Sequence, residues 1–188
     1  MPKNTRFLQL KISLKGAKPP IWRRVVVPDN LILLDLHEVI VAAMGWDGYH
    51  LHQFDAFGQF YGNPEDDLFG DGDILDEKKP RLSEFLNKEK SKISYEYDFG
   101  DGWEHQILLE KIVPIAEQYP VCIKGKRACP PEDVGGISGY EEFLEILANP
   151  EHPDYDDTLD WVGEDFDSEA FNLNDVNGTL ARLAFFKA

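Results

Sequence analysis

The sequence predicts an α+β fold, in which a largely antiparallel sheet carries helices packed on one side and a helical part follows toward the C-terminus. Three observations support this: strand-like alternation opens the chain, a β-hairpin pattern occupies residues 93–113, and helical periodicity dominates after residue 138. Strands followed by mixed elements and then helices differ from the regular strand–helix alternation of parallel sheets. Because 188 residues suit one domain, we expect a single domain over residues 1–188.

Composition supports a folded protein with its own core. Hydrophobic residues make up 43% of the chain and aromatic residues 12%, which excludes a disordered chain. No apolar run approaches the length of a membrane helix, and Lys11 interrupts the only early apolar stretch. With only two cysteines, Cys122 and Cys129, no disulfide framework is expected. We therefore predict a cytoplasmic protein without a membrane segment.

The net charge of −16 is distributed unevenly along the chain. Residues 128–181 contain 15 Asp or Glu and no Lys or Arg, whereas residues 1–28 contain seven basic residues and no acidic one. The simpler interpretation is a solvated surface that opposes aggregation. The functional interpretation is an acidic surface for a basic protein partner, or end-to-end docking in a homodimer. The negative net charge makes nucleic acid an unlikely partner. Nucleic-acid binding through Arg23 and Arg24 in the basic N-terminal strands is kept as a weaker alternative.

The first sixty residues predict three strands and one helix. Residues 6–14 alternate apolar and polar side chains, and residues 21–27 form a second β-rich run that ends at Pro28, so an antiparallel pair is expected. Apolar residues recur at helical spacing from 35 to 45, with Asp35 as the expected N-cap. A third strand is expected at 50–57.

The central hairpin has two possible registers. A two-residue turn would place Asp98 opposite His105, an acid–imidazole pair. A three-residue turn at 100–102 pairs Tyr97 with His105 and keeps the large apolar side chains on one face. We favour the three-residue turn, with Gly102 in the left-handed conformation.

The rest of the chain is expected to alternate irregular segments with helices. Irregular segments are predicted at 58–80, 114–137 and 151–169. Helices are predicted at 82–86, from 138 to 149 and from 174 to 186. Ser138 followed by Glu141 has the spacing of a capping box.

Four separated blocks carry a family resemblance: IWRRVVVP at 21–28, LHEVIVAAMGWDGYHLHQF at 36–54, YEYDFGDGWEH at 95–105 and CPPEDVGGISGYEEF at 129–143. Together they resemble the plasmid pRiA open-reading-frame-three-like family, which includes passenger proteins of insertion elements. The resemblance implies a single α+β domain, no established activity, and by association an accessory role in mobile elements. The family often has a second cysteine where this chain has Val134, which argues against a thiol-pair or zinc role there.

Histidines supply the first candidate site. His50 and His52 lie two apart on a predicted strand and so share a face, and His105 with a carboxylate such as Asp98 or Asp101 could complete a divalent metal site. A zinc or manganese ion there could activate water for hydrolysis. The simpler interpretation for His105 is a hydrogen-bonded core histidine.

Tryptophans supply the second candidate site. Trp46 and Trp103 each lie beside a loop that carries an acidic residue, Asp47 or Asp101. They could form the rim of a ligand or peptide groove, although aromatic residues of this kind are more often core.

Two functional hypotheses remain from the sequence. The first is a non-catalytic interaction or regulatory module, based on the charge asymmetry. The alternative is a metal-dependent hydrolase that uses the His50, His52 and His105 cluster on a small or nucleotide-like substrate.

Overall fold

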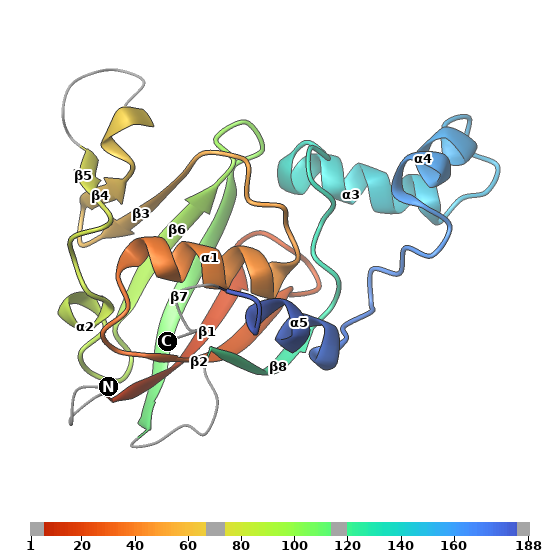
Figure 1. Cartoon of the computed structure of the whole chain (residues 1–188). Helices are drawn as coiled ribbons and strands as arrows, with labels where there is room; N and C mark the ends of the chain where they lie inside the picture. The colour runs from red at the N-terminus through yellow and green to blue at the C-terminus, as the bar shows by residue number, and fades with distance from the viewer. Residues whose placement is uncertain (1–5, 67–73, 114–119, 184–188) are drawn as a thin grey trace.

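The computed structural model describes residues 6–66, 74–113 and 120–183. Its strands are β1 (Phe7–Leu14), β2 (Trp22–Pro28), β3 (His52–Ala56), β4 (Gln59–Gly62), β5 (Ile74–Asp76), β6 (Lys92–Tyr97), β7 (Trp103–Val113) and β8 (Val121–Lys126). They form one sheet in the order β5-β4-β3-β6-β7-β1-β2-β8 (Figure 1). All neighbouring pairs are antiparallel except β4 and β5. The predicted α+β fold with a largely antiparallel sheet is confirmed.

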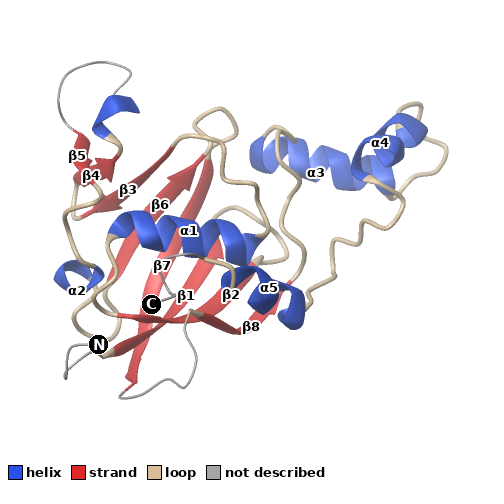
Figure 2. Cartoon of the chain, viewed as in Figure 1, coloured by secondary structure: helices blue, strands red, loops and turns tan. Residues whose placement is uncertain are grey.

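Helices lie on the sheet and beyond its edge. They are α1 (Leu33–Met44), the short 3-10 helix η1 (Pro64–Asp66), α2 (Leu82–Phe85), α3 (Gly136–Leu147), α4 (Tyr155–Val162) and α5 (Leu173–Leu180). Helix α1 crosses one face of the sheet, and α5 lies beside α1 and β8, with which it makes its contacts (Figure 2). Helices α3 and α4 pack on each other and extend away from the sheet. In the described residues no helix is long and apolar enough to cross a bilayer.

The core lies between the sheet and α1. Alternate residues of β1 belong to this core, and Leu8, Leu10 and Ile12 are fully buried. Burial of each such side chain contributes about 1.5–3 kcal/mol to folding. Helix α1 begins at Leu33, two residues before the predicted cap, so Asp35 lies in its first turn, where a negative charge is favourable. The helix ends at Gly45 in the left-handed conformation, as predicted.

The central hairpin keeps the predicted faces but has a different register. Tyr97 pairs with Trp103 and Tyr95 pairs with His105, so the three-residue turn was wrong. Five residues, 98–102, connect the strands, because Asp98 leaves β6 with a φ of 58° and accepts a hydrogen bond from the backbone nitrogen of Gly102 at 2.6 Å through its own carbonyl. A shift of two residues preserves which side chains face the core.

Several segments expected to be irregular contain regular structure. Strands β4 and β5 lie in the predicted loop 58–80, of which residues 67–73 are outside the described part. Strand β8 lies in the predicted arm 114–137, where lysines conceal the strand pattern, and α4 lies in the acidic segment 151–169. At the sheet edge, the side chain of Asn177 pairs with both backbone groups of Cys122, at 2.8 and 2.9 Å. This interaction closes part of an edge that would otherwise be open to another strand.

The C-terminal helices are held by aromatic contacts. Helix α3 begins at Gly136 with Gly135 as its N-cap, so Ser138 lies inside the helix and is not its cap. Phe143 of α3 contacts Phe166 and Trp161, with ring centroids 5.2 and 5.9 Å apart. Helix α5 ends at Leu180, and residues 184–186 of the predicted final helix lie outside the described part.

Candidate metal centre

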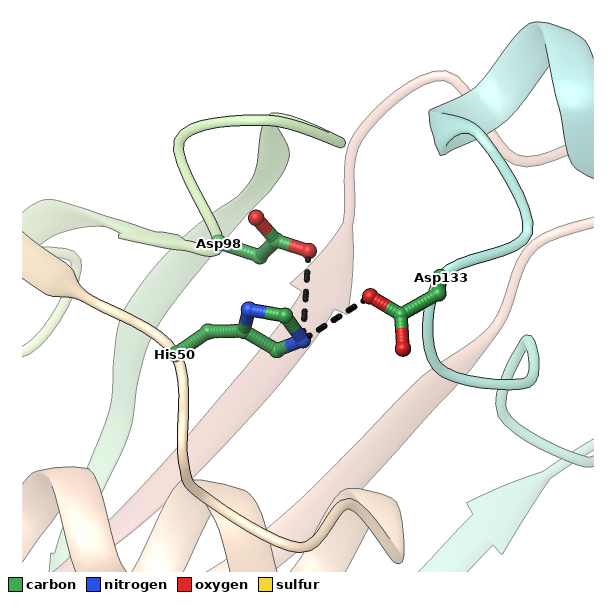
Figure 3. A group of neighbouring side chains, drawn as sticks. All are labelled: His50, Asp98 and Asp133. Atoms are coloured by element: carbon green, nitrogen blue, oxygen red, sulfur yellow. Dashed lines mark ion pairs between the residues drawn. The ribbon is translucent and has the colours of Figure 1, made fainter.

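Three segments that are distant in sequence bring a histidine and two carboxylates together. His50 precedes β3, Asp98 begins the turn between β6 and β7, and Asp133 lies in the segment that precedes α3. The Nε2 atom of His50 is 3.5 Å from Oδ2 of Asp98 and 3.2 Å from Oδ1 of Asp133 (Figure 3). The three ligand-type atoms lie within 4.8 Å of one another. We call this group the His50 cluster.

These distances fit a shared ion better than direct hydrogen bonds. The Nε2 atom of His50 is buried and forms no hydrogen bond, although carboxylate oxygens surround it. Nitrogen and oxygen ligands lie about 2.1 Å from zinc-like ions, so two ligands of a tetrahedral site are separated by about 3.4 Å. The two separations from His50 lie on either side of this value. Both separations from His50 are therefore close to the separation of two ligands of one ion.

Glu132 provides a third carboxylate beside the cluster. Its Oε2 atom is 3.7 Å from Nε2 of His50, is buried and has no hydrogen-bond partner. Its Oε1 atom accepts hydrogen bonds from the backbone nitrogen of Asp47 at 2.8 Å and from the hydroxyl of Tyr97 at 3.1 Å. One oxygen is thus held in place while the other faces His50.

The two aspartates follow the same pattern. Oδ1 of Asp98 accepts a hydrogen bond from the backbone nitrogen of Gly100 at 2.9 Å, and Oδ2 of Asp133 accepts one from the hydroxyl of Tyr49 at 3.0 Å. Their other oxygens face His50. Hydrogen bonds that orient ligand atoms in this way are typical of metal centres.

The two tyrosines next to the cluster are held as neutral hydrogen-bond donors. The hydrogen bond to Asp133 raises the pKa of Tyr49 to about 12. Burial raises the pKa of Tyr97, and the Glu132 carboxylate adds to that rise. The backbone nitrogen of Gly48 donates a hydrogen bond to the Tyr97 hydroxyl at 3.1 Å, which fixes its position.

The backbone at both aspartates is strained. Asp98 and Asp133 have φ angles of 58° and 59°, in the left-handed region that residues other than glycine rarely adopt. Such conformations cost about 1–3 kcal/mol each and are concentrated at functional sites. Here they turn two carboxylates toward one histidine.

The structure brings only His50 and Asp98 of the predicted metal ligands together. His52 pairs with Glu77 at 2.9 Å and stacks on His37, with ring centroids 3.5 Å apart. His105 is fully buried, and its Nδ1 atom lies 2.8 Å from the carbonyl oxygen of Trp103. The predicted three-histidine cluster is therefore not formed among the described residues.

Two local features explain this correction. Strand β3 begins at His52, so His50 lies in the preceding loop and does not share a strand face with His52. The two-residue shift in the hairpin places His105 opposite Tyr95, deeper in the core. Asp133 takes the place expected for the missing histidines, and Glu132 lies beside the group. The signal for them in the sequence is the CPPED block at 129–133, in which two adjacent acidic residues follow a rigid proline pair.

The predicted tryptophan groove is only partly formed. Trp103 is 0% exposed and Trp46 6% exposed, so Trp103 belongs to the core and forms no rim. Trp46 donates a hydrogen bond to the carbonyl of Pro130 at 3.0 Å and lines a cavity of about 390 Å³. Asp101 accepts a hydrogen bond from the backbone nitrogen of Gly135 at 3.1 Å, which joins the hairpin turn to the start of α3.

That junction predicts a large effect of substituting Gly136. A Cβ atom at Gly136 would overlap the carbonyl oxygen of Asp101, and the φ of 69° already disfavours other residues. We expect Gly136→Ala to lower the free energy of unfolding by about 1–3 kcal/mol through overpacking, and to displace the segment that carries Asp133. Gly163→Ala is the matched control, because Gly163 has a φ of 93° and no atom within 4 Å of the added Cβ. Urea denaturation of both variants tests this, and equal losses would contradict it.

Two buried histidines predict acid sensitivity of the fold. Burial lowers the pKa of His37 to about 3 and the pKa of His105 to about 4, from 6.5. Because both values fall on folding, the unfolded chain binds more protons below pH 6.5, and stability is lost as the pH decreases toward these values. At pH 5 each of these histidines lowers the free energy of unfolding by about 2 kcal/mol relative to neutral pH.

His105→Phe isolates one of these contributions. Between about pH 7.5 and 5, we expect the variant to lose about 2 kcal/mol less stability than the unsubstituted protein. His152→Phe should lose as much as the unsubstituted protein, because His152 is only partly buried and pairs with Asp154 near the surface. Urea denaturation at the two pH values measures the difference. Parallel losses in all three proteins would exclude His105 as a source of acid sensitivity.

Comparison with known proteins places the chain in a family. The model of the plasmid pRiA4b ORF-3-like protein family matches residues 6–175. The chain is 41% identical over 179 residues to the uncharacterized protein y4hQ of Sinorhizobium fredii (strain NBRC 101917 / NGR234), covering 94% of this chain and 92% of that protein. The chain is also similar to the crystal structure of a protein of unknown function, MM3350 from Methanosarcina mazei Go1, with a TM-score of 0.81 and 45% sequence identity. The match covers 91% of this chain and 97% of the MM3350 chain.

These matches define the class as α+β domains of unknown function. The chain belongs to the plasmid pRiA4b ORF-3-like family, as its sequence blocks indicated. The relatives that it matches carry no described activity, so function must be argued from the His50 cluster itself.

Proposed function

We propose that this domain binds one divalent metal ion through His50, Asp98 and Asp133 and is a metal-dependent hydrolase. The observation that carries the proposal is the buried Nε2 atom of His50, which has no hydrogen bond and lies 3.2 and 3.5 Å from two carboxylate oxygens. Nitrogen and carboxylate ligands together suit zinc, manganese or iron.

The number of ligands supports a catalytic role. Catalytic zinc sites commonly have three protein ligands and leave a position for water, whereas structural sites use four. The ion would supply Lewis acidity, which lowers the pKa of a bound water. Glu132 Oε2 is buried, has no hydrogen bond and lies 3.7 Å from His50 Nε2, close enough to the ion site to accept a proton from that water.

Charge around the cluster favours a neutral substrate. The three negative charges of Asp98, Glu132 and Asp133 exceed the positive charge of a divalent ion. No Lys or Arg occurs between residues 128 and 181. A phosphate ester would therefore approach a negative surface. We expect an ester or amide in preference to the nucleotide-like substrate considered from the sequence.

The first test is metal binding by the native, tag-free protein. Elemental analysis should find close to one zinc, manganese or iron per chain, and calorimetric titration of the chelated protein should return the same stoichiometry. His50→Gln should abolish it, whereas His152→Gln, at the partly buried pair with Asp154, should not. Loss of bound metal in both variants would exclude the metal centre. So would an unsubstituted protein that binds neither zinc, manganese nor iron.

A second function is favoured by one observation on the acidic part, residues 128–181. Helix α4 buries none of its residues, and Trp161 is 53% exposed. Such a surface suits a basic protein partner, in line with the interaction module predicted from the charge pattern. The plasmid in the family's description supports, by association only, an accessory role in mobile elements. Binding of basic peptides that survives Trp161→Ala unchanged would count against this second function.

A further inference from the structure

The cavity beside Trp46 is formed by Arg23 of β2 and by three further segments. It has a volume of about 390 Å³ and lies between the end of α1, residues 128–132 and residues 162–176. Its walls include the aromatic side chains Trp46, Phe166 and Phe171. Small-molecule sites have volumes of about 300–1,000 Å³ and are mostly apolar with a few polar groups. The cavity meets both conditions.

Arg23 is the one cationic side chain among the described residues that line this cavity, and it is only 2% exposed. Its Nε atom donates to the carbonyl of Ala43 at 2.8 Å, and Nη1 donates to the carbonyls of Trp22 and Lys126 at 3.0 and 3.1 Å. The ring of Phe171 lies 4.7 Å from Cζ. All of these partners are uncharged.

The guanidinium group is therefore incompletely compensated. In the described part of the chain Arg23 forms no ion pair with a carboxylate and no hydrogen bond through its Nη2 atom, which is not fully buried and therefore retains access to solvent. Burial lowers the pKa of Arg23, as expected for a cation without an anionic partner. Buried charges in proteins are normally paired.

A structural role explains only part of this arrangement. Ala43 lies in the last turn of α1, where a cation satisfies a free carbonyl and interacts favourably with the helix dipole. That role uses Nε alone. It does not explain why the same side chain lines an aromatic cavity.

We infer that this cavity binds a small monoanionic molecule with a flat apolar body, whose carboxylate pairs with Arg23. The aromatic walls suit the flat body, and a carboxylate matches the guanidinium group in geometry and charge. Glu132 and Asp175 also line the cavity, so a second negative charge on the ligand would be repelled. The ligand therefore carries one negative charge.

The probes are benzoate and phenylacetate, with benzamide as the neutral control. Ligand-observed NMR or calorimetry should show saturable binding of at least one of the two acids and at least tenfold weaker binding of benzamide, a difference of about 1.4 kcal/mol. Equal binding of benzamide, or no binding of either acid up to its solubility limit, would overturn the inference.

Two variants locate the binding. Ala128→Leu fills the cavity without removing the charge, and Arg23→Lys keeps the charge but loses the planar donor group. Both should weaken binding of the acid at least tenfold while the far-UV circular dichroism stays unchanged. If Arg23→Lys does not fold, Ala128→Leu still decides, because unchanged affinity in that variant excludes the cavity.

Glu132, the proposed proton acceptor, lines the cavity, but none of the three proposed metal ligands does. The Asp98→Asn protein should bind the acid as the unsubstituted protein does, since Asp98 does not line the cavity. Acid binding without metal binding would refute the proposed hydrolase alone. Metal binding without acid binding would refute the cavity ligand alone.

Discussion

Asp98→Asn should reduce the affinity for a divalent metal ion by at least about 100-fold, because loss of a group that merely orients a ligand already costs about 10–100-fold. The substitution replaces one ligand oxygen and leaves the rest of the turn intact. Asparagine keeps the oxygen that accepts from Gly100, and it tolerates the φ of 58° better than most residues. Calorimetric titration of the chelated protein measures the change.

The matched control lies in the same turn. Asp101→Asn removes the same charge three residues further on, and its oxygen can still accept from Gly135. We expect its metal affinity to stay within a few-fold of the unsubstituted protein. An equal loss in Asp101→Asn would mean that general negative charge, and not coordination, attracts the ion.

Thermal stability gives an independent measure of the same effect. Without an ion, three carboxylates gather around one histidine and repel one another. Chelation should therefore lower the melting temperature of the unsubstituted protein and leave that of Asp98→Asn unchanged. Relief of repulsion should also make the chelated variant at least as stable as the chelated parent. The opposite order would assign Asp98 a purely structural role.

The sequence predicts those features of the fold that depend on neighbouring residues, and it misses those that depend on local backbone conformation or on position at the sheet edge. The faces of β1 and of the central hairpin follow from apolar alternation, which is a property of neighbouring residues. The hairpin register does not, because the left-handed conformation of Asp98 lengthens the turn by two residues without changing any face. Strand β8 is missed for a related reason: as an edge strand it carries exposed Lys124 and Lys126, as edge strands commonly do.

The site was harder to predict than the fold, because it is assembled by contacts between distant segments. His50 and Asp98 are recognisable as ligand types, and both are part of the cluster. Their partner Asp133 is 35 residues beyond Asp98, as the numbering shows, and its position depends on how the segment before α3 docks on the hairpin turn. No periodicity encodes that docking.

Glu132→Gln should lower the rate of ester hydrolysis by about 100-fold or more, the usual contribution of a general base. Glutamine keeps the oxygen that accepts from Asp47 and Tyr97 but cannot take up a proton. The carboxylate oxygen that faces His50 is replaced by an amide nitrogen. We therefore expect turnover to fall while the fold and the position of the side chain are retained.

Metal affinity separates this role from coordination. Glu132 lies outside the set of atoms that are within 4.8 Å of one another, so we expect Glu132→Gln to bind metal within a few-fold of the parent. A fall in metal affinity in step with the rate would make Glu132 a fourth ligand, and the centre would then be closed and structural. Metal-loaded protein assayed with p-nitrophenyl acetate provides the rate, with bis(p-nitrophenyl) phosphate as the anionic comparison.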